Sequence, residues 1–456
     1  MNVTEFATKI RNNVTAYRKV TPDWSGVFEE LPLLTKSNYL LSYPMEELCE
    51  EGELDKIHLI GASSGFSKTG AVYWPKRPQD EADYMQNIET MFVTNYHIDT
   101  KKTLMIECLA FGMWIGGMQI ATAYRNIALS GKYRMTLATP GLDLKTAVDV
   151  IGQYHKRYDQ IIITTNPGNL PLIAALIKQN NIELPKASVY FAVVGEYFTE
   201  SFREYVCELF GHPKDAYNIV WTGYGSADTG YVSQETKNSI KLRKYFYKHP
   251  ELSKKVFGSE STPMILECLS PDVYIEAVNG NIVVTKDQFI PLVRYNTADS
   301  GGLVTEEQLK DVPQELVAPL LSNIKAGRVM YIYGRVGNAV IFYGTNLMIN
   351  DIQEFLLSQP ADMEYGGLFT VSEKQTEGIA YLEFTIYIRT QNIDRKRNTL
   401  ESNYFSKLID YLCDYSAEFR IKYQNLSKSV NIPLISLKVE NINNIPAGTK
   451  HKFIID

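Results

Sequence analysis

The middle of this 456-residue chain alternates short apolar runs with longer amphipathic stretches. Three such pairs follow one another, and their apolar runs read RMTLAT, QIIITT and SVYFAVVG. Each run has the length and apolar content of a buried strand, and each is followed by a stretch that suits a helix. Strand–helix alternation of this kind is typical of an α/β domain with a largely parallel sheet.

The pattern changes along the second half of the chain. After Tyr224 the apolar runs become more strand-like, with GNIVVT, IPLVRYN, RVMYIYG and AVIFYG. From about Arg335 onward, strand-like and helical segments mix in a small α+β unit of about 120 residues. Because 456 residues exceed what one ordinary core organises, we predict a large α/β domain with mixed sheets and a small α+β C-terminal domain.

Composition excludes several classes of protein. The formal net charge of -6 means that the chain lacks the excess of basic residues that is typical of nucleic-acid-binding proteins. The 45% hydrophobic content is ordinary for a globular chain. The five cysteines include no C-x-x-C pair, so neither a disulfide framework nor a zinc site is indicated, and we expect a cytoplasmic protein. The uncharged segment over 108–124 contains three glycines and is shorter than a spanning helix needs, which favours a buried α/β segment and no membrane association.

A loop rich in glycine and hydroxyl side chains, GASSGFSKTG over 61–70, separates two strand-like runs. It fails the P-loop pattern because Ala62 and Ser67 stand at the two glycine positions. It matches the G-x-S-x-G elbow of hydrolases with Ser63 as nucleophile, but that elbow needs a helix directly afterwards, and a further strand follows here. The remaining interpretations are a hairpin loop whose N–H and hydroxyl groups cradle phosphate, and an ordinary polar turn.

This loop is the first of several blocks that come in a fixed order. The blocks read SSGFSKTG, VGE, GYGSADTG, IPLVRYNTADSG, YGRVGN and NIPAGTKHKFIID, with LPLLTK, FGMWIGG and TPG before VGE. Together they resemble the signature blocks of the adenylate-forming superfamily, most closely the phenylacetate–CoA ligase branch, over nearly the whole chain. The resemblance implies an N-terminal AMP-binding domain over 1–333, a hinge over 334–338 and a mobile C-terminal domain over 339–456.

The blocks depart from the family pattern at several positions. Each departure replaces a residue that is usual in the family by another: Phe66 for Thr, Lys68 for Gly, Asp228 for Glu, Ala298 for Gly, Gly337 for Asp and Thr449 for Gly.

The resemblance implies a two-step reaction with ATP, Mg²⁺ and coenzyme A. A carboxylate attacks the α-phosphate of ATP to give an acyl-adenylate, and a thiol then displaces AMP. The nearest branch makes an aryl acid the expected substrate. Two alternatives stay open: loading of an acyl carrier protein's phosphopantetheine, and a degenerate homologue that binds nucleotide without catalysis. The oligomeric state is also open, with a homodimer among the options.

The resemblance further assigns residues to the nucleotide. The phosphates would be gripped by Ser63, Ser64, Gly65, Ser67, Lys68 and Thr69. Adenine would lie along the block formed by Gly223, Tyr224, Gly225 and Ser226. Asp299 would accept hydrogen bonds from the ribose hydroxyls, and Arg335 would bond the ribose or phosphate side at the domain junction.

Catalysis and acid binding are assigned in the same way. Asp228 would help to hold Mg²⁺, a cation that prefers oxygen ligands. Lys450 would stabilise the charge that develops during adenylation, with Lys452 as its rival and a solvated terminal lysine as the plain alternative. The acid would contact Phe111, Gly195 and Glu196.

Overall fold

The structure is a computed structural model that carries side chains. It describes residues 1–62, 73–167, 169–195, 197–198, 200–258, 262–335, 339–349, 352, 355–356, 358–376, 378–388, 393–441, 444 and 454–455.

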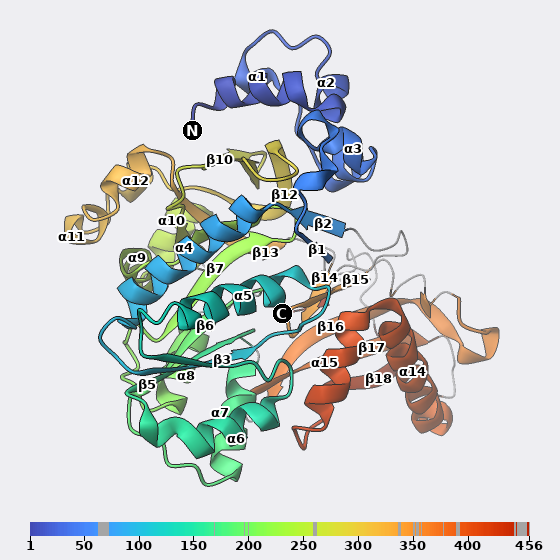
Figure 1. The fold of residues 1–456 in the computed structure, drawn as a ribbon. Coiled ribbons are helices and arrows are strands. Elements are labelled where there is room, and N and C mark those ends of the chain that lie inside the picture. The colour runs from blue at the N-terminus through green and yellow to red at the C-terminus, as the bar shows by residue number, and fades with distance from the viewer. Residues whose placement is uncertain are drawn as a thin grey trace.

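One large sheet of eleven strands organises most of the chain (Figure 1). Its strand order is β10-β11-β12-β13-β9-β8-β7-β6-β5-β3-β4. The last five strands in this order run parallel to one another. They are β7 (Val220–Ser226), β6 (Val189–Val193), β5 (Gln160–Thr165), β3 (Thr103–Cys108) and β4 (Met135–Ala138).

The other half of the sheet is antiparallel. Its strands are β10 (Val273–Val278), β11 (Asn281–Lys286), β12 (Leu292–Leu303), β13 (Val329–Arg335), β9 (Met264–Glu267) and β8 (Gly230–Gln234). The sequence predicted this change from alternating to strand-rich segments, and the mixed α/β sheet is confirmed.

Helices cover both faces of the parallel half. Side chains alternate between the faces of a strand, so Leu104 and Ile106 pack on one side and Met105 on the other. The first side is covered by α6 (Leu144–Tyr154), α7 (Asn169–Gln179) and α8 (Glu200–Leu209). The second is covered by α4 (Pro78–Tyr96) and α5 (Ile115–Leu129). Such two-sided burial explains why the strands read as continuous apolar runs.

Smaller elements surround this sheet. At its antiparallel end lie α9 (Lys237–Lys248), α10 (Pro250–Phe257), α11 (Gln314–Val317) and α12 (Leu321–Lys325). The N-terminal segment contributes α1 (Val3–Asn13), α2 (Thr15–Val20) and α3 (Met45–Leu48). A separate antiparallel hairpin, β1 (Leu59–Ala62) and β2 (Tyr73–Lys76), flanks residues 63–72.

The C-terminal part forms a second α+β layer, drawn in orange and red in Figure 1. It begins with the hairpin β14 (Ala339–Phe342) and β15 (Thr345–Met348). A four-stranded sheet follows, in the order β18 (Ile435–Asn441), β17 (Ile379–Ile388), β16 (Tyr365–Thr376) and β19 (Ile454–Ile455). Its helices are α14 (Ile393–Tyr415) and α15 (Ala417–Ser427).

The uncharged segment over 108–124 forms the end of β3, a short connection and most of α5. Ile120 and Tyr124 are buried against the sheet. Among the described residues, no helix combines the length and the apolarity needed to cross a membrane.

Candidate functional site

A cavity of about 280 Å³ lies at the carboxyl ends of the parallel strands. It is lined by Thr164 and Asn166 at the end of β5, by Val193–Gly195 at the end of β6, and by Gly223–Ser226 on β7. The start of α5 closes it from the side. Parallel strands place their carboxyl ends at one edge of a sheet, where α/β proteins bind ligands.

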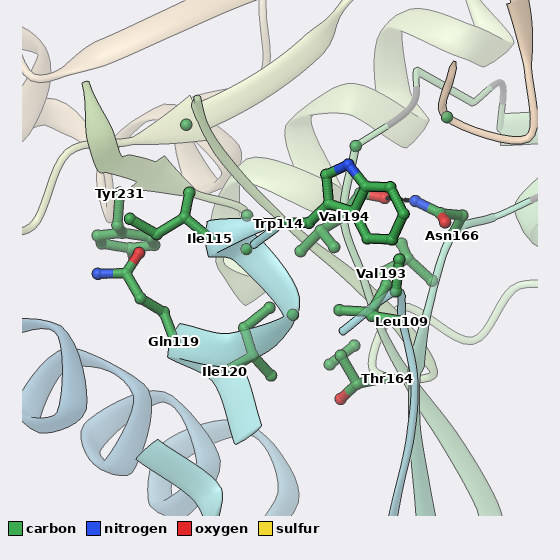
Figure 2. Close-up of a pocket in the computed structure, with 18 of the residues that line it drawn as sticks. Leu109, Trp114, Ile115, Gln119, Ile120, Thr164, Asn166, Val193, Val194 and Tyr231 are labelled. Carbon is green, nitrogen blue, oxygen red and sulfur yellow. Dashed lines mark hydrogen bonds between the residues drawn. The ribbon is translucent and has the colours of Figure 1, made fainter. Parts of the chain in front are cut away.

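The walls of the cavity are largely aromatic and aliphatic. In Figure 2, Trp114 and Asn166 lie toward one end of the cavity, and Tyr231 and Gln119 toward the other. The larger apolar and aromatic lining residues are Tyr84, Ile88, Met91, Leu109, Trp114, Ile115, Ile120, Tyr124, Val193, Trp221 and Tyr231. An apolar pocket with few polar groups is the usual form of a small-molecule site.

The turn after β6 depends on a glycine. Gly195 has φ +90°, and a Cβ on it would come within 2.9 Å of Nδ2 of Asn166. That amide donates a 2.8 Å hydrogen bond to the carbonyl of Val194, which fixes the turn against β5. Gly195 therefore lets the backbone line the cavity without a side chain.

The β7–β8 hairpin brings two predicted blocks together. The Oη of Tyr224 donates a 2.6 Å hydrogen bond to Oδ2 of Asp299. Asp299 in turn is the register partner of Arg335, across β12 and β13. Gly225 and Gly230 pass so close that a Cβ on Gly225 would lie 2.2 Å from the Gly230 carbonyl oxygen. Tyr224, Asp299 and the backbone of Arg335 thus share one edge of the site.

Asp228 sits in the same hairpin and is buried. The Oη of Tyr295 donates a 2.5 Å hydrogen bond to Oδ2 of Asp228, and Nζ of Lys36 lies 4.0 Å from Oδ1. The amide of Gln288 donates to the Asp228 carbonyl. Strand β12 therefore contacts the hairpin twice, through Tyr295 and through Asp299.

A magnesium ion at Asp228 would have one protein carboxylate. Among the described residues, no group of three or more His, Cys, Asp or Glu is arranged to hold a metal. Mg²⁺ often binds through one or two carboxylates together with water and substrate phosphates. Asp228, whose Oδ2 already accepts from Tyr295, would therefore hold such an ion only together with ligands from outside the described residues.

Two lysines, Lys76 and Lys286, place their Nζ atoms beside Gly230 of this hairpin. Nζ of Lys286 donates to the carbonyls of Thr229 and Tyr231, at 2.8 and 2.6 Å. Burial, aided by the nearby ammonium of Lys76, lowers the pKa of Lys286 to about 7. Burial also lowers the pKa of Lys76. Because burial favours the neutral form of both amines, an anion bound near the hairpin would in turn favour their protonated forms.

One departure from the family pattern has a visible geometric consequence. The backbone at Ala298 adopts φ +61°, the left-handed region that favours glycine. The family's usual glycine would fit this position without strain. Here Ala298 adopts this left-handed conformation, and its N–H donates a 2.8 Å hydrogen bond to Oδ1 of Asn296.

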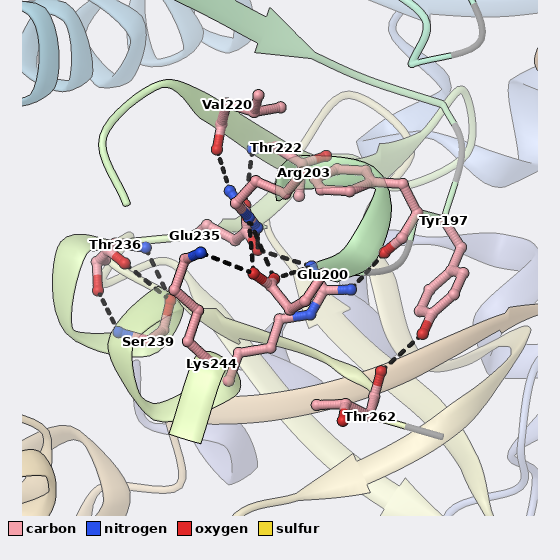
Figure 3. Close-up of polar contacts among 12 residues, drawn as sticks. Tyr197, Glu200, Arg203, Val220, Thr222, Glu235, Thr236, Ser239, Lys244 and Thr262 are labelled. Atoms are coloured by element: carbon pink, nitrogen blue, oxygen red, sulfur yellow. Dashed lines mark hydrogen bonds and ion pairs between the residues drawn. The ribbon is translucent and has the colours of Figure 1, made fainter. Parts of the chain in front are cut away.

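A buried charge cluster contacts β7, one of the strands that line the cavity (Figure 3). The side chains of Glu200, Arg203, Glu235 and Arg243 have no solvent exposure and pair with one another at 2.5–3.2 Å. Glu235 also accepts a hydrogen bond from the N–H of Thr222 on β7, and its partners Arg203 and Arg243 donate to the carbonyls of Val220 and Phe198. These bonds fix β7 relative to the segment that follows Gly195.

One buried acid has no such partner. Glu107 lies on β3 on the same face as Met105, beside the register partner Thr164 that lines the cavity. Its side chain is fully buried, and neither carboxyl oxygen has a hydrogen-bond partner among the described residues. Burial raises the pKa of Glu107 to about 8.

Several predicted residues fall outside the described part of the chain. They are Ser63, Ser64, Gly65, Ser67, Lys68 and Thr69, together with Glu196, Gly337, Lys450 and Lys452. The side chain of Arg335 also lies outside it. Of the remaining predicted residues, Gly195, Gly223, Tyr224, Gly225 and Ser226 line the cavity, and Asp299 is bonded to one of them.

Phe111 occupies a different position from the one expected. It packs over Gly141, where a Cβ would meet its ring at 3.0 Å, and it is not among the residues that line the cavity. Trp114, three residues later, lines the cavity instead. Sequence reasoning identified the segment but not which aromatic side chain faces inward, because the turn between β3 and α5 decides that. It also missed Asn166, Trp221 and Glu107.

Comparisons with known proteins agree with this architecture. No protein-family model matches the sequence, and no curated protein matches it. Among solved structures, 2-hydroxyisobutyryl-CoA ligase in complex with 2-HIB-AMP and CoA in the thioesterification state is similar over 100% of this chain and 88% of that chain, with a TM-score of 0.62 and 12% identity. The chain has the fold of the adenylate-forming ligases.

The same ligase has been solved in other arrangements, and these are less similar. Its postadenylation state with 2-HIB-AMP gives a TM-score of 0.52 at 12% identity, with 100% of this chain and 88% of that chain covered. Its open conformation with 2-HIB-AMP and CoA gives 0.50 at 12% identity, with 99% and 89% covered. The overall arrangement of this chain is therefore most like the thioesterification state among these three.

Proposed function

We propose that the protein is an AMP-forming acid–thiol ligase. It would activate a carboxylic acid as an acyl-adenylate and pass the acyl group to the thiol of coenzyme A. The observation that carries this proposal is the Tyr224–Asp299 hydrogen bond at the edge of an apolar cavity, within a fold of the adenylate-forming type. A nucleotide end and an acid end then lie within one site.

At the nucleotide end, Asp299 would accept hydrogen bonds from the ribose hydroxyls. The hydroxyl of Tyr224 donates to one oxygen of the Asp299 carboxylate. A carboxylate has about four acceptor lone pairs, which is enough to accept from a diol as well. Arg335, which faces Asp299 across the strand register, would bond the ribose or the phosphates. Gly223 and Gly225 would let adenine approach the backbone of β7 closely.

The triphosphate would lie between the loop of residues 63–70 and the β7–β8 hairpin. Lys76 and Lys286 lie on the hairpin side, and bound phosphate groups would favour the protonated forms of these two buried amines. Asp228 would hold a Mg²⁺ ion shared with the phosphates, and that ion would neutralise part of their charge. The protein's own contribution is to position the reactants and to stabilise developing charge.

At the acid end, an aryl acid is the substrate class that we propose. Trp114, Trp221 and Tyr231 offer aromatic surfaces in a cavity of about 280 Å³, which suits a compact ring more than a long alkyl chain. Gly195 would lie close to the ring or chain of the acid.

We further propose a boundary between two domains at residues 334–338, with 339–456 turning as one unit. Lys450, brought in by the C-terminal domain, would contact the α-phosphate during adenylation. In the present arrangement Gly344, Glu418 and Lys422 of that domain line the cavity. The higher similarity to the thioesterification state supports this arrangement as the thiol-transfer state.

A screen of pyrophosphate release tests the proposal. The protein, ATP and Mg²⁺ are mixed with aryl, short aliphatic and fatty acids, and we expect acid-dependent release that is greatest with an aryl acid. The matched control is Asp311→Asn, which changes an exposed aspartate that is outside the cavity lining. If none of the acids in the panel leads to pyrophosphate release and the protein still binds AMP tightly, the result would instead favour the degenerate nucleotide-binding protein. Coenzyme A and a phosphopantetheine-loaded carrier protein are then compared as acceptors.

A further inference from the structure

Helix α15 of the C-terminal part carries an ion pair into the cavity. Ser416 caps the start of the helix, and its side chain accepts a hydrogen bond from the N–H of Phe419. Glu418 and Lys422 are one helical turn apart and both line the cavity, together with Gly344. In Figure 1 this helix lies on the side of the C-terminal part that faces the large sheet.

The pair is nearly closed to solvent. Nζ of Lys422 lies 2.6 Å from Oε1 of Glu418 and donates a 2.5 Å hydrogen bond to the carbonyl of Tyr343. The side chains are 4% and 9% exposed. Lys422 is thus well satisfied, and so is one oxygen of Glu418.

The second oxygen of Glu418 is different. Oε2 is buried and has no hydrogen-bond partner among the described residues. A buried carboxylate oxygen without a donor is costly, so such an atom on a cavity wall indicates that a ligand supplies the donor. A purely structural ion pair between helix turns would explain Oε1 and Lys422, but it leaves the buried Oε2 of this cavity-lining residue without a donor.

We propose that Oε2 of Glu418 accepts a hydrogen bond from the arm that carries the acceptor thiol. This inference rests on the proposed function. It applies to the present arrangement, in which the C-terminal part closes over the carboxyl edge of the large sheet. The arm's amide N–H groups and its S–H are both suitable donors, and Lys422 orients the carboxylate through Oε1.

Glu418→Gln tests the proposal with little change in shape. The amide oxygen can still accept from Lys422, and the NH₂ group then takes the place of Oε2 and meets the ligand donor with another donor. We expect kcat/KM for thioester formation from ready-made acyl-adenylate and coenzyme A to fall at least about tenfold, mainly through KM. Pyrophosphate release from ATP and acid should fall much less than thioester formation, because that step precedes the arrival of the thiol.

The matched control is Glu383→Gln in the same part of the chain. Glu383 pairs with Lys438 at 3.3 Å on a solvent-exposed surface and lies outside the cavity lining. The Glu383→Gln variant should leave the rates of both half-reactions and the melting temperature unchanged. A thermal melt of Glu418→Gln checks that the variant is folded.

A binding measurement keeps the inference separate from the proposed function. Calorimetry with AMP present compares the affinities of coenzyme A and pantetheine for the wild-type protein and for Glu418→Gln, and it needs no knowledge of the acid. Weaker binding of both by the variant supports the contact. Equal affinities, no binding by the wild-type protein, or equal losses in both half-reactions would overturn it. Failure of the acid screen alone would overturn only the proposed function. Ethanethiol has an S–H but no amide, so it separates the two kinds of donor. If Glu418→Gln also slows transfer of the acyl group to ethanethiol, the contact is with the S–H, and if it does not, the contact is with an amide N–H.

Discussion

Glu107→Gln should stabilise the folded protein, and the gain should depend on pH. The carboxyl of Glu107 is fully buried on β3 and has no hydrogen-bond partner among the described residues. Burial raises its pKa from 4.5 to about 8. In the unfolded chain this group ionises freely above its ordinary pKa, whereas in the folded protein it stays protonated until about pH 8.

The sign and size of the effect follow from proton linkage. Between the two pKa values the folded state binds more protons than the unfolded state, so the free energy of unfolding falls as pH rises. Each pKa unit corresponds to about 1.4 kcal/mol, so at pH 7 the ionisable group costs the folded state about 3 kcal/mol. A glutamine cannot ionise, so this cost disappears.

Urea denaturation at pH 5, 6, 7 and 8, followed by tryptophan fluorescence, measures the difference. We expect the variant's advantage in free energy of unfolding to be below about 1 kcal/mol at pH 5 and to rise to about 3 kcal/mol at pH 7. The matched control is Glu307→Gln, whose parent side chain is 81% exposed and should show no pH-dependent gain. An advantage for Glu107→Gln that stays flat across pH would refute the reasoning.

Three further changes test the site and its support. Asp299→Asn should weaken AMP binding by about 1.5–3 kcal/mol, because a charged acceptor for the ribose is lost, and unchanged affinity in calorimetry would reject that role. Lys450→Ala should slow pyrophosphate release about a hundredfold or more, as loss of about 3 kcal/mol of transition-state stabilisation would, while thioester formation from ready-made adenylate survives. If pyrophosphate release is slowed only by Lys452→Ala and not by Lys450→Ala, Lys452 is the adenylation lysine. Glu235→Leu should destabilise the fold by about 3–5 kcal/mol, since Arg203 and Arg243 would stay buried without this partner, and a denaturation midpoint like that of the wild-type protein would contradict it.

The fold was largely predictable because its strongest determinants are local. Buried parallel strands such as β5, with the run QIIITT, need apolar residues on both faces, and that requirement is visible in any single strand. The ordered blocks then placed Tyr224 and Asp299 in one site, and the 2.6 Å hydrogen bond between them agrees with that placement. Their roles in binding nucleotide stay predictions.

The rest depends on contacts between residues far apart in the sequence. No local pattern indicates that Trp114 faces the cavity while Phe111 packs on Gly141, because the turn before α5 sets both directions. Likewise, the run TLMIEC does not by itself indicate that Glu107 is buried, because its burial depends on elements that pack against β3 from elsewhere in the sequence. Glu418 reaches the cavity only through the packing of the C-terminal part against the large sheet.

The most direct test of the central claim follows an oxygen atom from the acid into AMP. The protein is incubated with ATP, coenzyme A and an ¹⁸O-labelled acid that supports pyrophosphate release, and the AMP is analysed by mass spectrometry. If the carboxylate attacks the α-phosphate and the thiol then displaces AMP, each AMP carries one ¹⁸O from the acid. Unlabelled AMP, or formation of ADP and phosphate instead, would contradict the assignment of this chain as an adenylate-forming ligase.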